Sequence, residues 1–193
     1  MGGQDLCSMN EEEWKHEQLK RTDESRFAGR AERAARTKVH GLIPNHFFSF
    51  ASSECRDVFI DGHYYASISL AQAVAEGLAR YLGDFHQVGA KKDPPKRVRR
   101  LLSKGVISQR ITDAFLRIWG NDRNTFHHVN TDIQTDHQEL ERRAEECVNS
   151  LLEIESDVFA YEISEGKIVP KVHAYWPRVD SEHLQVFLRL SGH

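Results

Sequence analysis

The chain has 193 residues, which is enough for one domain with a buried core or for one domain with a short appendage. Hydrophobic residues make up 39% and charged residues 28%, a composition too apolar for a disordered chain. There are 26 lysines and arginines against 29 aspartates and glutamates, so the net charge is −3. A protein that binds nucleic acid over its whole surface would be basic, and that class is excluded.

The three cysteines, Cys7, Cys55 and Cys147, lie far apart and form no CxxC pair. This spacing argues against a disulfide framework and against a zinc ribbon. Glutamates occupy positions 11–13, where a secretory signal would be apolar. No window reaches the run of about 18 apolar residues that crosses a bilayer. We therefore expect a reducing, cytoplasmic location and no membrane partner.

Residues 1–40 form the first predicted unit, a charged N-terminal helix. The sequence from Asn10 to about Arg36 contains no proline and predicts an exposed helix with a weak apolar stripe. Residues 41–157 form the second predicted unit, a helical bundle. Its first part, residues 41–58, mixes aromatic and small residues and predicts a packed loop or a short helix.

The strongest predicted helix runs from about His63 to Leu82, with Asp61 as its cap and Gly83 as its end. Apolar residues recur along it at steps of three and four, which is typical of one buried helix face. They are Tyr64, Ile68, Ala71, Ala75, Leu78 and Leu82. We expect this helix to form the centre of the bundle.

Three more helices are predicted in the bundle, over about 96–103, over 108–119 with Ser108 as the cap, and in a long segment that ends near Glu155. The apolar stripe of the long segment is Leu140, Ala144, Cys147, Val148, Leu151 and Leu152.

Residues 158–193 form the third predicted unit, a β-prone appendage packed on the bundle. It contains a hairpin that turns at Glu165-Gly166, and the region 185–190 suggests a third strand. Tyr161, Tyr175 and Trp176 can stack on RNA bases, but aromatic residues more often pack such a hairpin onto a core or a partner chain. The predicted fold class is mainly α, an up-and-down bundle of four or five helices with a short C-terminal β-hairpin.

The segment 121–128 places Arg123 about one helical turn before His127 and His128. An arginine fork at a helix N-terminus suits a phosphate, and a neighbouring histidine can move a proton at neutral pH. RNA cleavage without a metal needs a base for the 2′-OH, a cation beside the phosphorus and an acid for the leaving 5′-oxygen. One histidine does not easily serve both proton transfers, so a second copy of the chain would help.

This segment also has other interpretations. An arginine with a histidine one turn later occurs by chance in many helices, and the two histidines can form a surface pair. A metal site would use His128 and Asp132, but the metalloprotease spacing is absent and no cysteine lies nearby. No metal and no cofactor are expected.

An arginine, a polar residue and then a histidine with four to six residues between the arginine and the histidine, at the start of the last long helix of a small bundle, resemble the motif of the HEPN superfamily. Arg123, Asn124 and His128 match this pattern, and His127 is one residue too close. Residues 64–76 and 99–107 resemble the second bundle helix of that family and the stretch that leads into the third. The resemblance covers about residues 55–157.

The resemblance implies a bundle that dimerises with the two motifs facing each other in a cleft. Many members of the family are metal-independent endoribonucleases, often toxins or antiphage effectors. It implies that Arg123 and His128 are catalytic and that Asn124 positions them. The chain departs from the family at Val129, where glycine is common, and at Asn130, where one subset has a tyrosine that a partner enzyme modifies.

Six of the ten residues from 91 to 100 are basic, and Lys104 follows them. We interpret Lys96, Arg97, Arg99, Arg100 and Lys104 as an RNA-binding cluster, with a solvated helix face as the equal alternative.

Glu76 lies in the apolar central helix. It either pairs with a buried arginine, orients the active-site groups, or points into solvent.

The function predicted from these features is metal-independent cleavage of RNA by a cytoplasmic homodimer of HEPN type, with an antitoxin or a defence-system protein as a further partner. The alternative is a catalytically silent HEPN-type module that binds a nucleotide, RNA or a protein, or that serves dimerisation.

Overall fold

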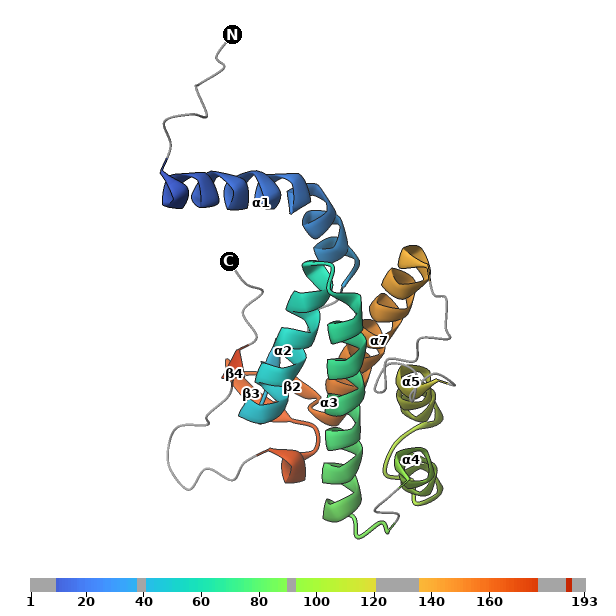
Figure 1. Cartoon of the computed structure of the whole chain (residues 1–193). Coiled ribbons are helices and arrows are strands. Elements are labelled where there is room, and N and C mark those ends of the chain that lie inside the picture. The colour runs from blue at the N-terminus through green and yellow to red at the C-terminus, as the bar shows by residue number, and fades with distance from the viewer. Residues whose placement is uncertain (1–9, 38–40, 90–92, 121–135, 177–186, 189–193) are drawn as a thin grey trace.

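The computed structural model describes residues 10–37, 41–89, 93–120, 136–176 and 187–188. Over these residues the fold is mainly α: six α-helices pack together and are followed by a two-stranded antiparallel hairpin (Figure 1). The predicted fold class is confirmed. No helix in the described part of the chain has the length and apolar character needed to cross a membrane.

The first helix, α1 (Glu11–Arg36), is confirmed as an exposed helix and buries none of its residues. A capping box starts it, because the Asn10 side chain accepts from the backbone of Glu13 and the Glu13 side chain accepts from the backbone of Asn10. Its C-terminal part touches the bundle, where Arg33 Nε donates to the carbonyl of Ile60 at 2.8 Å. Its N-terminal part extends away from the bundle (Figure 1).

Two helices, α2 (His46–Ile60) and α3 (Tyr64–Phe85), pack against each other as a helical hairpin. The predicted boundaries of the central helix need two corrections. Asp61 is the C-cap of α2, and the position before α3 is occupied by His63, whose side chain makes no capping bond. Gly83 does not end α3, because the helix continues through it to Phe85.

The next two helices, α4 (Pro94–Ser103) and α5 (Gln109–Trp119), lie across the bundle and are seen nearly end-on in Figure 1. Each starts at a side-chain cap. Asp93 accepts from the backbone of Lys96 at 2.9 Å, and Ser108 accepts from the backbone of Ile111 at 3.3 Å.

The last long helix, α7 (His137–Val158), lies beside α3 and α5 and starts at Asp136, whose side chain accepts from the backbone of Glu139 at 2.7 Å. Every residue of its predicted apolar stripe is buried. Together with the stripe of α3 it forms the core, whose largest fully buried side chains include Trp119, Phe59 and Phe115.

The predicted hairpin is confirmed as β2 (Tyr161–Ser164) and β3 (Lys167–Pro170). Glu165 and Gly166 turn it with positive φ angles of 51° and 73°. The predicted third strand is present as β4 (Phe187–Leu188), but it does not extend this hairpin. It pairs with β1 (Leu42–Ile43), which precedes α2.

The aromatic residues of the tail pack onto the bundle, as the structural interpretation predicted. Tyr175, which ends the short 3₁₀ helix η1 (His173–Tyr175), and Trp176 are both buried. The Tyr175 hydroxyl lies 2.5 Å from His86 Nε2 at the end of α3, and the Trp176 ring meets the Tyr161 ring edge-on.

A close approach between α3 and α4 depends on Gly83. Arg97 is buried, and its aliphatic stem crosses α3 at this glycine. A Cβ atom on Gly83 would lie 2.7 Å from Arg97 Cδ, so any larger residue would displace the arginine.

We predict that Gly83→Ala lowers the free energy of unfolding by about 1–2 kcal/mol through overpacking, although alanine is the better helix former. In the Arg97→Ala background the same change should be neutral or should stabilise by up to about 1 kcal/mol, because nothing is then displaced. Urea denaturation of the four chains measures the coupling. Equal effects of Gly83→Ala in both backgrounds would contradict this packing.

Candidate functional site

The three residues predicted to be catalytic, Arg123, Asn124 and His128, lie in segment 121–135, outside the described residues. The structure describes the two helices that flank this segment, α5 before it and α7 after it. It leaves α5 after Trp119 and enters α7 at His137.

A buried polar cluster lies where the segment leaves α5. The carbonyl of Ile118 accepts hydrogen bonds from Gln72 Nε2 of α3 at 3.4 Å and from Arg143 Nη2 of α7 at 3.2 Å. Cys147 Sγ, also on α7, donates to the same oxygen at 3.8 Å. Helix C-termini leave carbonyls without intrahelical partners, and these contacts satisfy one of them from two neighbouring helices.

Arg143 is the charged member of this cluster. It is 8% exposed and its Nη1 forms an ion pair with Glu146 at 2.8 Å. Gly120, with a φ of +50°, packs so closely that a Cβ there would lie 2.6 Å from Arg143 Nη2. The end of α5 is therefore fixed against a buried guanidinium.

Three polar atoms around this point are buried without a hydrogen-bond partner in the described part of the chain: Gln72 Oε1, Trp119 Nε1 and Arg143 Nε. Buried polar groups in native proteins are mostly paired, and these three have no partner among the described residues. The Cys147 thiol offers no nucleophile here, because burial raises its pKa to about 11.

A second polar cluster fixes the start of α7. The Tyr64 hydroxyl donates to Glu141 Oε2 at 2.6 Å, and Arg36 at the end of α1 pairs with Glu141 and Glu145. The Tyr64 ring packs against the ring of His137, with centroids 5.0 Å apart. Both ends of segment 121–135 are thus held by buried or half-buried polar contacts.

These contacts change the proton affinities of the two partners. Burial, and then the hydrogen bond to Glu141, raise the pKa of Tyr64 to about 12. Burial also raises the pKa of Glu141, but the hydrogen bonds from Tyr64 and Arg36 outweigh it, so that the pKa is lowered overall. At neutral pH Tyr64 donates and Glu141 is an anion.

The predicted RNA-binding cluster divides between the two faces of α4. Lys96, Arg99, Arg100 and Lys104 are exposed at helical spacing, and we call these four residues the α4 basic stripe. Arg97 is 2% exposed and lies on the opposite face with Val98 and Leu101, so it is not part of this surface.

None of the four stripe residues forms an ion pair within the described residues. Arg100 Nη1 and Lys104 Nζ do donate to the carbonyls of Gly89 and His86, at 2.8 and 3.3 Å. Several arginines elsewhere on the surface are paired with carboxylates; Arg110, for example, contacts both Glu153 and Asp157. The stripe is therefore a local excess of positive charge on an acidic chain.

Two other predicted features are placed by the described residues. Glu76 is half-buried on α3 and forms an ion pair with Arg80 at 3.3 Å, one turn along the same helix. No group of three or more potential metal ligands is found among the residues that the structure describes.

The sequence interpretation missed the burial of Gln72 and Arg143, and it assigned the buried Arg97 to the RNA-binding surface. The signal was spacing: Arg143 follows Leu140 by three residues and precedes Cys147 by four, which puts it on the apolar stripe of α7.

Comparison of the chain with protein-family models, with curated proteins and with solved structures found no match.

We predict that Tyr64→Phe lowers the free energy of unfolding at neutral pH by about 1–2 kcal/mol, because Glu141 loses a hydrogen bond. The pKa of Tyr64 is raised on folding, so its stabilising effect is complete below about pH 10, the ordinary tyrosine value, and is lost as the pH rises towards 12.

Denaturant unfolding between pH 8 and pH 11 checks this prediction. Stability should fall less steeply with pH in the variant than in the wild type. Some slope should remain, because burial also raises the pKa of Tyr81 and Tyr175. Equal slopes in the two proteins would show that Tyr64 is not held in this way.

Proposed function

We propose that the chain is a metal-independent endoribonuclease of HEPN type that acts as a homodimer. The observation that carries the proposal is the Arg123-Asn124…His128 spacing in the segment that joins two core helices, α5 and α7, of a helical bundle. The resemblance implies a helical bundle, and the described residues have a mainly α fold.

The proposed chemistry uses two groups of the chain. His128 takes the proton of a ribose 2′-OH as its oxygen attacks the adjacent phosphorus, and the guanidinium of Arg123 stabilises the charge that develops on the phosphoryl oxygens. The 5′-oxygen leaves with a proton from a second acid, which the second copy of the chain supplies through its own His128. The products are a 2′,3′-cyclic phosphate and a 5′-hydroxyl. Asn124 positions the pair.

Rigid anchoring of the two segment ends supports this assignment. Catalytic groups must be held close to their reactive geometry, and flanking elements that do not move reduce the cost of holding them. The Ile118 carbonyl is bound from α3 and α7, and the first turns of α7 are bound to α1 and α3 through Glu141.

The α4 basic stripe supports RNA as the substrate. Its four cations have no carboxylate partner among the described residues, so phosphates would not have to displace an existing ion pair. A stripe that binds RNA without cleavage would also serve the alternative function, a catalytically silent module, and the cleavage assay separates the two.

We predict that the purified chain cleaves single-stranded RNA in excess EDTA and leaves 2′,3′-cyclic phosphate ends. His128→Ala and Arg123→Ala should each reduce the rate by about 100-fold or more, which is the usual contribution of such groups. The matched control is His127→Ala, the adjacent histidine at the wrong spacing, which should retain cleavage.

Two outcomes would overturn the proposal. Equal cleavage by the wild type and by His128→Ala would mean that the activity lies elsewhere. RNA binding by the wild type without cleavage of any RNA would favour the silent module.

We further predict that Arg99→Gln weakens RNA binding and reduces the slope of log K against log salt by about 0.7, the value for one phosphate contact on a single strand. The control is Arg110→Gln, which removes the same charge where Glu153 and Asp157 already offset it. Fluorescence anisotropy over a salt series gives both slopes. Equal slopes for the two variants would remove the α4 basic stripe from the RNA-binding surface.

A further inference from the structure

The helix α1 has an exposed stripe of charged and polar side chains around one leucine. Glu12, His16, Leu19, Asp23 and Arg26 follow one another at steps of four, three, four and three, which places them on one side of the helix. All five are exposed, and Leu19 is 71% exposed. We call these five residues the α1 face.

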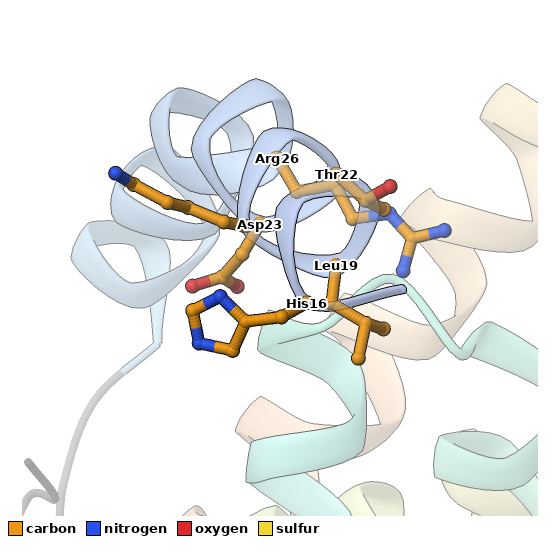
Figure 2. Close-up of a pocket in the computed structure, with 6 residues that line it drawn as sticks. His16, Leu19, Thr22, Asp23 and Arg26 are labelled. Carbon is orange, nitrogen blue, oxygen red and sulfur yellow. The ribbon is translucent and has the colours of Figure 1, made fainter. Parts of the chain in front are cut away.

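An open hollow of about 460 Å³ lies along the same face (Figure 2). The described residues that line it are His16, Leu19, Lys20, Thr22, Asp23 and Arg26. All of them belong to α1, so no other described element supplies the facing wall.

The charged residues at the two ends of the α1 face have no ion-pair partner among the described residues. Glu12 and Arg26 form no ion pair there, whereas Arg30, one turn further on, is bound to Asp23 at 2.8 Å and to Asp61 at 2.9 Å. Asp23 keeps acceptor capacity, because a carboxylate can accept about four hydrogen bonds.

We propose that the α1 face binds the α1 face of a second copy, with the two helices antiparallel and the two-fold axis beside Leu19. Glu12 and Arg26 each lie seven residues from Leu19, so the glutamate of one copy faces the arginine of the other. His16 lies three residues before Leu19 and Asp23 four residues after it, so the imidazole of one copy lies one residue, about 1.5 Å along the helix axis, from the level of the carboxylate of the other. On reversal, the stripe brings opposite charges together at its two ends and Leu19 against Leu19 at its centre, as a two-fold interface requires.

The energetics favour a protein helix as the occupant. A helix that buries none of its residues is marginal in water, and pairing removes the exposed Leu19 side chains from solvent. Antiparallel helices also bring opposite dipole ends together. A nucleic acid or an anionic membrane is disfavoured, because Glu11, Glu12 and Glu13 crowd the first turn. This inference does not depend on whether the chain cleaves RNA.

Cross-linking of the full chain tests the axis. In a Cys7→Ser background, Leu19→Cys should give a disulfide-linked dimer under mild oxidation with diamide, since Cys55 and Cys147 are buried. The control is Ser25→Cys, an exposed position on the other side of α1, which should give little dimer. Circular dichroism establishes that each variant is folded.

Charge exchange tests the register. Glu12→Arg and Arg26→Glu, each combined with Leu19→Cys, should each lower cross-linking about tenfold, because like charges then meet twice in every dimer. An equal mixture of the two should restore it, since each variant supplies the charge that the other has lost. Glu24→Arg, off the face, should have no effect.

The proposal is overturned if Leu19→Cys cross-links no better than Ser25→Cys, or if the mixture of charge variants cross-links no better than either variant alone. The first result would leave the α1 face to a different partner. The second would mean that the two helices meet in another register.

Discussion

The fold depends on how closely other helices can approach α3. Its buried face contains Ala71, Ala75 and Ala79 between larger residues, and Gly83 follows near its end. Small side chains bring neighbouring backbones close and leave room for long side chains from other helices, as Arg97 shows at Gly83. Four helices, α2, α4, α5 and α7, contact α3, so a change of volume on this face is felt in most of the bundle.

The same packing decides where polar groups can be buried. The carbonyl of Ile118 lies between α3 and α7, and the side chains that reach it, those of Gln72, Arg143 and Cys147, come from stripes that are otherwise apolar. A buried guanidinium is costly unless it is paired, and Glu146 pairs it here. The bundle thus uses part of its core to fix the end of α5, from which the segment with Arg123 and His128 departs.

The surface charge of this molecule is better described by which side chains form ion pairs than by the net charge of the chain. Carboxylates offset many of the surface arginines, including Arg36, Arg80 and Arg110. Two surfaces depart from this pattern: the α4 basic stripe, and the α1 face with its unused end charges. A net charge of −3 describes neither of them, because binding depends on the local arrangement of charges.

The sequence by itself determined the buried faces of α3 and α7, because a period of three to four residues is a local property of the chain. It left residues 41–58 open between a packed loop and a short helix, and the structure forms α2 there. The apolar stripes of α3 and α7, the cap at Ser108 and the hairpin turn at Glu165 were all predictable. The catalytic role of Arg123 and His128 is a hypothesis that rests on their spacing in the sequence.

Only the tertiary structure decided the long-range pairings. β4 pairs with β1, which is more than 140 residues away in the chain, and hydrophobic alternation carries no information about which edge a strand joins. Likewise, the sequence predicted that Gly83 ends the helix. In the fold, α3 continues through Gly83, and the missing side chain leaves room for Arg97. A glycine has the same local preference in both roles, and the neighbouring helix determines which one it takes.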